Sequence, residues 1–154
     1  MIEPPQTLDR AGILTRIPHK GLSCLLDALH GWDTKTIVCE ARSHLLATNP
    51  YRLVDRLPAV CAVEYASQAI ALHSALKAER VSRSAAPAPS GYLASVRGLT
   101  LSVTALDGLA GSLFIAAEVL SAERDRMLYA FHIRHESTTI AEGRLSIALH
   151  TTKQ

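Results

Sequence analysis

The stretch Leu57–Leu76 reads LPAVCAVEYASQAIALHSAL, and it decides the fold. Its residues are small, apolar or neutral polar apart from a single formal charge, Glu64. This composition is typical of a helix that is buried on most of its circumference. Removing a carboxylate from water costs several kcal/mol unless the group is paired, hydrogen-bonded or protonated. The sequence therefore predicts a long buried helix in which Glu64 has a specific role.

The segments on either side of this helix predict strands. Upstream, Lys35–Ser43 is rich in β-branched residues, and Leu22–Leu29 is either a short strand or a helical turn. Four extended segments with turn signals between them follow the helix: Tyr92–Leu106, Ser112–Leu120, Met127–Arg134 and Ile140–Leu149. This order predicts an α+β protein with one domain over residues 1–154. In it, an antiparallel sheet of five to six strands wraps around one long central helix.

Charge and composition argue against two classes of partner. A net charge of +2 without a basic run gives no electrostatic footprint for nucleic acid. The helix has the length of a membrane span, but its Glu64, Gln68 and His73 are each costly in lipid. Residues 1–12 lack the pattern of a secretory signal. We therefore expect a cytoplasmic protein that binds neither nucleic acid nor membrane.

The three cysteines, Cys24, Cys39 and Cys61, are widely spaced and lie in apolar contexts. This usage is typical of small buried side chains in a reducing compartment. A cysteine nucleophile or a disulfide is the alternative.

A narrow polar strip runs along the helix. Gln68 lies one turn after Glu64, Val60 lies one turn before it, and Ser67 flanks them. His73 lies almost opposite Glu64, so it belongs elsewhere. This strip favours a functional site at Glu64. The alternatives are a structural carboxylate at Glu64 and a Gln68 that satisfies buried backbone groups.

The residues of this helix resemble a known signature. LPAVCAVEYASQA resembles the approximate MPGVLxxEAxAQA of the hot-dog-fold 3-hydroxyacyl-(acyl-carrier-protein) dehydratases; the matches are Pro58, Val60, Glu64, Ala66, Gln68 and Ala69. Upstream, PHKGLSCLLD (Pro18–Asp27) resembles that family's PHRxPFLLVD, and GYLASVRGLTLSV resembles its sheet segment. The pattern SH…NPxR…LPxxxxxEYxxQA is similar to the divergent branch of the aryl-polyene pigment pathways of Gram-negative bacteria. The resemblance implies a hot-dog fold.

The same resemblance implies a lyase that converts 3-hydroxyacyl thioesters into trans-2-enoyl thioesters. His44 follows its strand as the family's catalytic histidine does, although the 20 residues to Glu64 are more than usual. Dehydration needs a base and an acid on facing sides of the substrate, and we expect His44 as the base and Glu64 as the acid. Burial would bias the Glu64 carboxyl towards its protonated form.

Further residues are expected to bind substrate. The backbone N–H groups of Ala59 and Val60, at the start of the helix, would stabilise an enolate oxygen. Gln68 would orient Glu64 or hold the departing water. Arg52 and Arg97 are either solvated or bind the phosphopantetheine phosphate or an acidic carrier protein. Alanine replaces the family's glycine at Ala59, and the family's usual loop before the helix is absent.

The resemblance also implies partners. The substrate would be carried on the phosphopantetheine of an acyl carrier protein, so no other cofactor and no metal are expected. Hot-dog dimers take the histidine and the glutamate from different protomers, so we expect a homodimer or higher oligomer, or a pairing with a paralogous hot-dog subunit. His19 lies in a matching motif and is expected to be structural or to line the rim of the site.

Two other functions fit the same sequence. The first is an acyl thioesterase in which Glu64 activates water or acts as the nucleophile. The second is a non-catalytic partner subunit, if the long loop Leu45–Arg56 leaves His44 out of reach.

Overall fold

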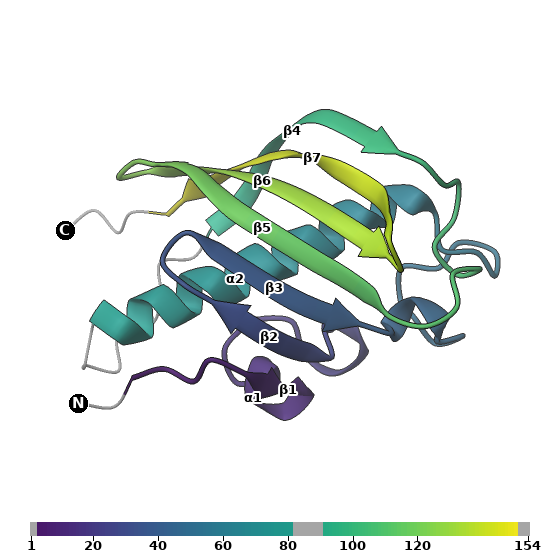
Figure 1. Ribbon diagram of the computed structural model, residues 1–154, viewed down its shortest axis with the longest axis horizontal. Coiled ribbons are helices and arrows are strands. Elements are labelled where there is room, and N and C mark those ends of the chain that lie inside the picture. The colour runs from purple at the N-terminus through teal and green to yellow at the C-terminus, as the bar shows by residue number, and fades with distance from the viewer. Residues whose placement is uncertain (1–2, 82–90, 151–154) are drawn as a thin grey trace.

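Helix α2 lies across one face of a curved antiparallel sheet (Figure 1). This computed structural model describes residues 3–81 and 91–150. The seven strands follow the order β1-β2-β3-β5-β6-β7-β4. Their bounds are β1 Leu8–Asp9, β2 Ala28–Trp32, β3 Thr36–Ala41, β4 Gly91–Leu101, β5 Leu113–Ala122, β6 Arg126–His135 and β7 Thr138–Leu149. The α-helices are α1 Arg10–Leu14 and α2 Ala62–Val81, and the 3-10 turns are η1 Gly21–Ser23, η2 Ser43–Leu45 and η3 Ala59–Cys61.

The predicted α+β architecture, one antiparallel sheet around one long helix, is confirmed. The sheet has seven strands where five to six were expected, and the additional strand is short. Leu22–Leu29 is divided between turn η1 and strand β2, and the two-residue β1 pairs with β2 at the sheet edge. Residues 82–90 are rich in Ser, Ala and Pro, a composition that predicts a connecting segment, and they lie outside the described residues.

The entrance to the long helix differs from the prediction. The α-helix begins at Ala62, after the 3-10 turn η3, because the chain before it is bonded to the segment that precedes β5. Leu57 N–H donates to the Asp107 carboxylate across 2.9 Å, and Leu106 N–H donates to the Leu57 carbonyl across 2.8 Å. These bonds fix where the helix starts, and therefore the depth at which Glu64 lies.

Alternation along the strands places the core between sheet and helix. On β3, Ile37 and Cys39 are fully buried while Val38 is 38% exposed on the other face, as the alternation of a strand requires. Leu72 and Leu76 of α2 are also fully buried. Each such aliphatic side chain contributes roughly 1.5–3 kcal/mol when it leaves water, so this apolar layer holds the helix against the sheet.

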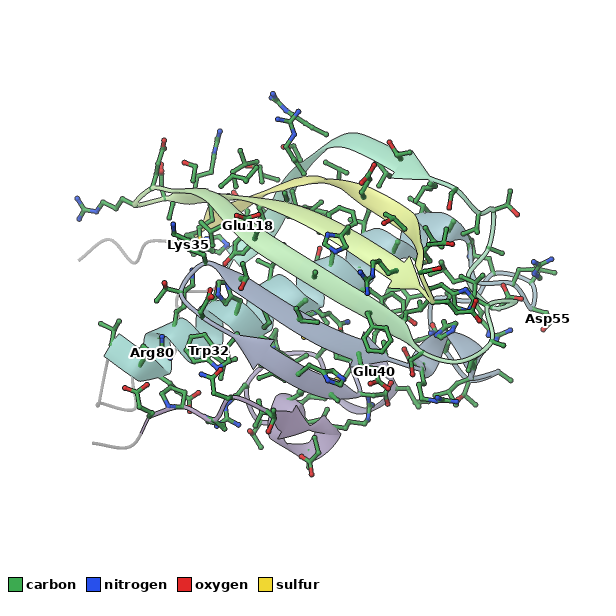
Figure 2. All side chains as sticks on the ribbon, in the orientation of Figure 1. Trp32, Lys35, Glu40, Asp55, Arg80 and Glu118 are labelled. Atoms are coloured by element: carbon green, nitrogen blue, oxygen red, sulfur yellow. The ribbon has the colours of Figure 1, made fainter. Side chains whose placement is uncertain are left out.

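A polar cluster around His73 lies inside this core, apart from Glu64. His73 is fully buried; its Nε2 lies 2.7 Å from the Asp33 carbonyl and its Nδ1 lies 2.8 Å from the Tyr129 hydroxyl. The carbonyl only accepts, so Nε2 carries the hydrogen and Nδ1 accepts from Tyr129. Next to it, the Arg80 guanidinium stacks over the Trp32 ring at 4.2 Å (Figure 2). These contacts support a structural role for His73.

The His73 cluster predicts a loss of stability in mild acid. Burial has the largest effect on the pKa of His73 and lowers it to about 4. The hydrogen bond to the Asp33 carbonyl raises this pKa in part, and the charge of Lys77 lowers it further. As the pH falls from about 6.5 to 4, His73 therefore binds a proton in the unfolded chain but not in the folded chain. We expect a loss of about 3 kcal/mol over this range. Urea unfolding at several pH values gives the free energy of unfolding as a function of pH. This free energy should fall less steeply with decreasing pH in His73→Gln than in wild type. An equal fall in both proteins would contradict the assignment.

Candidate active site

Glu64 is the centre of a polar cluster on the first turn of α2. The Tyr51 hydroxyl donates to Glu64 Oε1 across 3.2 Å, and the Gln68 amide donates to the same oxygen across 3.3 Å. His19 Nε2 lies 3.4 Å from Oε1, a long polar contact. The three side chains come from the segment before η1, the loop between η2 and η3, and the next turn of α2. The fold thus gathers two hydrogen-bond donors and the His19 ring around one carboxylate oxygen.

This cluster sets the ionisation of Glu64. His19 is the largest influence and lowers the pKa of Glu64 below its ordinary value; Gln68 and Tyr51 act in the same direction, because donors stabilise the charged form. Partial burial opposes them. The expectation that burial keeps Glu64 protonated is therefore wrong. Its side chain remains 32% exposed, so the donors outweigh the loss of solvent.

Gln68 joins Glu64 to the N-terminal half of the chain. It is fully buried, its Oε1 accepts from Leu25 N–H across 2.8 Å, and its Nε2 donates to the Ser23 carbonyl across 2.8 Å. The interpretation that Gln68 satisfies buried backbone groups is confirmed, and its expected role in orienting Glu64 or holding water stays a prediction. Gln68 satisfies buried backbone groups, and the same amide also contacts Glu64.

The long loop before the helix is held by buried polar contacts. The Ser43 hydroxyl lies 2.7 Å from the Tyr65 hydroxyl, and Asn49 Nδ2 donates to the Ser43 carbonyl across 3.0 Å. Asn49 Oδ1 accepts from the N–H of Tyr51 across 2.9 Å. Asn49 thereby places Tyr51 beside Glu64, so the loop supplies a side chain to the site.

A cavity of about 470 Å³ opens beside this cluster. It contains Glu64 and His19 and continues along α2 over small side chains. Its lining is Arg16, Pro18, His19, Glu64, Ser67, Ile70, Ala71, Ser74, Ala75, Gly91, Tyr92, Leu93, Met127, Ile147 and Leu149. A mostly apolar cavity with one carboxylate at its wall has the size and character of a small-molecule site.

His44 lies apart from this cluster in its own chain. Its side chain is fully buried in η2; Nε2 lies 2.8 Å from the Leu109 carbonyl, and Nδ1 has no hydrogen-bond partner among the described residues. Burial is the largest influence and lowers the pKa of His44, which agrees with the neutral ring expected of a base. The structure places His19, not His44, beside Glu64. A base role for His44 across a dimer stays a prediction.

The expected oxyanion donors are only partly available. The N–H of Ala59 donates to the Thr104 carbonyl across 3.0 Å, so this group is not free, and the expectation for Ala59 is wrong. Val60 is 56% exposed and is absent from the lining of the Glu64 cavity. Its expected role stays a prediction.

The two arginines differ. Arg52 donates to three backbone carbonyls of its own loop, those of His44, Leu46 and Asp55. Its guanidinium therefore holds the loop together. Arg97 is exposed on the edge strand β4, opposite Arg144 of β7. Its expected contact with an anionic partner stays a prediction.

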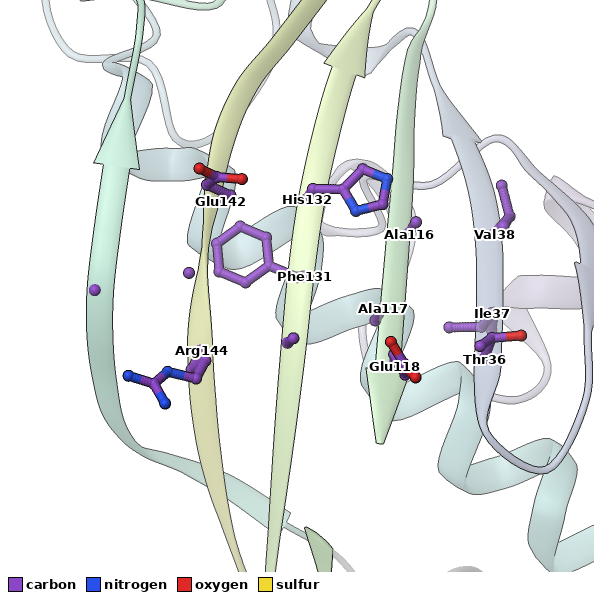
Figure 3. Close-up of a pocket in the computed structure, with 13 residues that line it drawn as sticks. Thr36, Ile37, Val38, Ala116, Ala117, Glu118, Phe131, His132, Glu142 and Arg144 are labelled. Atoms are coloured by element: carbon purple, nitrogen blue, oxygen red, sulfur yellow. The ribbon is translucent and has the colours of Figure 1, made fainter. Parts of the chain in front are cut away.

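A second hollow, of about 570 Å³, lies on the face of the sheet turned away from α2 (Figure 3). Alanines and glycines form part of its floor, and Glu118, His132, Glu142 and Arg144 lie around it. It shares no lining residue with the Glu64 cavity. Although it is larger, it contains none of the clustered donors, so we place the chemistry at Glu64.

The sequence did not point to Tyr51, whereas His19, expected to be structural or to line the rim of the site, lies in the lining of the cavity. The signal for Tyr51 was weak, because only the fold of the loop brings it to Glu64. His19 lies in the segment that resembles PHRxPFLLVD, and its motif was the available signal. Contact between residues 45 positions apart is set by the packing of η1 against α2 and not by a sequence period.

Comparison with known families identifies the chain. The family model described as ApeP-like, ApeP dehydratase, matches residues 12–153. The chain belongs to the ApeP-like dehydratase family. Membership agrees with the aryl-polyene dehydratase branch to which the sequence motifs pointed. A comparison with curated proteins gives no match.

Solved structures confirm the hot-dog fold. The dehydratase heterocomplex ApeI:P from Xenorhabdus doucetiae superposes with a TM-score of 0.78 at 21% identity, over 90% of this chain and 91% of the other. A thioesterase from Haemophilus influenzae superposes with a TM-score of 0.65 at 11% identity, over 100% of this chain and 98% of the other. A hypothetical thioesterase with coenzyme A from Streptococcus pneumoniae superposes with a TM-score of 0.57 at 9% identity, over 82% of this chain and 87% of the other. At these identities the likeness concerns the fold.

In the part of the chain that the structure describes, every helix is too short or too polar to span a bilayer.

Proposed function

We propose that this member of the dehydratase family removes water from 3-hydroxyacyl thioesters to give trans-2-enoyl thioesters, in the cavity beside Glu64. The observation that carries the proposal is a carboxylate held by His19, Tyr51 and Gln68 at the wall of a mostly apolar 470 Å³ cavity. A positioned carboxylate can transfer the proton that the elimination requires, and the apolar wall suits an acyl chain.

The proposed substrate is carried on the phosphopantetheine of an acyl carrier protein in the cytoplasm. Arg97, exposed on β4, is available to an acidic carrier, while Arg52 is occupied by its own loop. Carrier-bound and coenzyme A-bound forms of one 3-hydroxyacyl chain should be compared. A kcat/KM at least about tenfold higher with the carrier supports this substrate, and equal values count against it.

A second hot-dog chain is the proposed partner. Strand β4 lies at the edge of the sheet, and it exposes Tyr92, Leu93 and Val96 by 54%, 40% and 37%. An exposed apolar edge strand is a ready surface for pairing with another strand. Gly91, Tyr92 and Leu93 also line the Glu64 cavity, so a strand added there would close its open side. The ApeI:P heterocomplex makes a paralogous chain as reasonable a partner as a second copy.

Native mass spectrometry tests this partner. We expect the chain alone, or the chain expressed with a paralogous dehydratase subunit, to run as a dimer or larger assembly. Val96→Lys should weaken the assembly, because a charged side chain on an edge strand opposes pairing with another strand. Monomers under every condition would contradict the proposal. A dimer that is active only with an active paralogue would favour the non-catalytic role.

A thioesterase remains the second candidate, because solved thioesterases share the fold. One reaction mixture separates the two activities. Ultraviolet absorbance follows the conjugated enoyl thioester, and a thiol reagent follows hydrolysis. We expect enoyl product without free thiol; free thiol without enoyl product would establish the thioesterase.

A further inference from the structure

We propose that two copies of this chain pack back to back through the outer faces of their sheets, about a two-fold axis that crosses β5, β6 and β7. The outer face is the one turned away from α2, and it contains the hollow of about 570 Å³ (Figure 3). It is a different surface from the edge of β4 at which a second hot-dog chain is proposed. The inference does not depend on the proposed dehydration.

Small side chains form the centre of the outer face. Ala116 of β5 and Ala130 of β6 line the hollow, and both are half-buried between neighbours that point into the core. The solvated face of an antiparallel sheet usually carries polar side chains instead. The two alanines leave this part of the sheet covered by little of its own chain. The face therefore has room for the side chains of another molecule.

Long side chains alternate with these alanines in two rows across the strands. The backbone pairings place Ala116, His132 and Glu142 in one row, and Glu118, Ala130 and Arg144 in the next (Figure 3). All four long side chains of these rows are exposed. On β5 and on β6, an alanine is thus followed or preceded by a long side chain two residues away. On β7, a carboxylate and a guanidinium take these two places.

This alternation is self-complementary. A two-fold axis between the rows lays the first row of one copy over the second row of the other. His132 then faces Ala130 of the second copy, and Arg144 faces Glu142 of the second copy. Each contact occurs twice, as in any two-fold interface. The long side chains enter the spaces left by the alanines, which lets the two sheet faces interdigitate at a spacing of about 10 Å.

The charges on the outer face favour a second copy of the chain. Arg144 lies directly opposite Arg97 of β4, and like charges in this position repel. Among the described residues, neither Arg144 nor Glu142 takes part in an ion pair. The two-fold axis gives each of them an opposite charge. An acidic carrier protein would meet Glu118 and Glu142 on the same face, so it is a poorer match.

The area of the face is sufficient for a reversible contact. Strands β5, β6, β7 and β4 have 10, 10, 12 and 11 residues. At about 4.8 Å between strands and about 3.4 Å per residue, they offer on the order of 600 Å² per copy. Specific interfaces bury about 800 Å² per partner, with weaker ones below this value. We therefore expect an association whose extent rises with protein concentration.

An exchange of charge on β7 tests this interface. The test uses the Val96→Lys protein, in which the edge of β4 is blocked, so that the outer face alone can associate. Native mass spectrometry at about 10–100 µM should show a dimer. Arg144→Glu in this background brings like charges together at two symmetric points, and we expect dimerisation to weaken at least about tenfold. Adding Glu142→Arg restores opposite charges and should restore the dimer.

Arg124→Glu is the matched control. Arg124 is exposed in the turn beyond the end of β5, outside the two rows, and the same change of charge there should alter dimerisation by less than about twofold. Arg144 is also exposed, and a glutamate at its position would lie opposite Arg97, so the test variant should keep its fold. Thermal unfolding checks this.

Three results would overturn the inference. They are a Val96→Lys protein that stays monomeric at the highest concentration, a dimer that Arg144→Glu leaves unchanged, and a double exchange that restores nothing. If Arg144→Glu left the mass unchanged and removed the preference for carrier-bound substrate, the outer face would bind the carrier protein instead. An assembly of wild type that is lost entirely in Val96→Lys would support the edge of β4 alone, so the two interfaces fail separately.

Discussion

Glu64→Gln is expected to lower the rate of dehydration by about 10³-fold, with little change in stability. Glutamine has the shape of glutamate and still accepts from Tyr51 and Gln68 through its carbonyl oxygen, so the cluster can survive. Its amide cannot transfer a proton as a carboxylate does, and a positioned acid–base group contributes typically about 10²–10⁴-fold. The rate is measured by ultraviolet absorbance, and the fold by thermal unfolding.

Glu118→Gln is the matched control for this loss. Glu118 lies on β5 by the hollow on the outer face of the sheet, away from α2 (Figure 3). The same change of charge there should leave the rate within about twofold of wild type. If Glu118→Gln were as damaging as Glu64→Gln, the loss of activity would not be specific to the Glu64 cavity, and the two variants would no longer support the site there. If neither variant lost activity, the catalytic assignment to Glu64 would be wrong.

Glu64→Asp separates position from charge. Aspartate keeps the carboxylate but is one methylene shorter, so it cannot meet its donors and the substrate at the same distances. A displacement of about 1 Å typically costs about 10²-fold in rate. An activity between those of wild type and Glu64→Gln is therefore expected. This ranking of the three activities would indicate that the position of the carboxylate, set by His19, Tyr51 and Gln68, contributes to the rate in addition to its charge.

The fold was predictable because its signals are local. Strands β3 and β5 to β7 show in the sequence as alternation with a period of two residues. Helix α2 shows as a long apolar segment, and its period of 3.6 residues places the single charge on one face. Glu64 and Gln68 are four residues apart on one helix, so their contact was also predictable. The same reasoning placed His73 away from Glu64, and the structure bonds it to Tyr129 and Asp33.

The neighbours of Glu64 were less predictable because they depend on tertiary contacts. Tyr51 reaches the carboxylate only because Asn49 fixes the loop, and His19 reaches it only because Gln68 holds the segment after it. The ionisation of Glu64 depends on these same contacts, so composition alone gave the wrong direction for its pKa. As substrate excludes solvent from the cavity, burial should raise the basicity of this carboxylate, which suits its proposed role.

Gln68→Met is expected to destabilise the protein by about 3 kcal/mol and to lower Tm by roughly 6–12 °C. Methionine fits the buried space and is a good helix former, so neither volume nor propensity explains a loss. The loss follows because Leu25 N–H and the Ser23 carbonyl would remain buried without their partner. Each such group costs about 1–3 kcal/mol. Urea and thermal unfolding measure the change.

Ser67→Ala is the control for Gln68→Met, since it removes a polar group from the preceding position of α2. Among residues 3–81 and 91–150 its hydroxyl donates only to the Val63 carbonyl of its own helix, so the stability should change by less than about 0.5 kcal/mol. Gln68→Met should also lower activity in the fraction that remains folded, because the segment that carries His19 loses its anchor to α2. If stability fell but activity per folded molecule did not, Gln68 would hold the backbone alone, and Glu64 would depend on Tyr51 and His19 for its position.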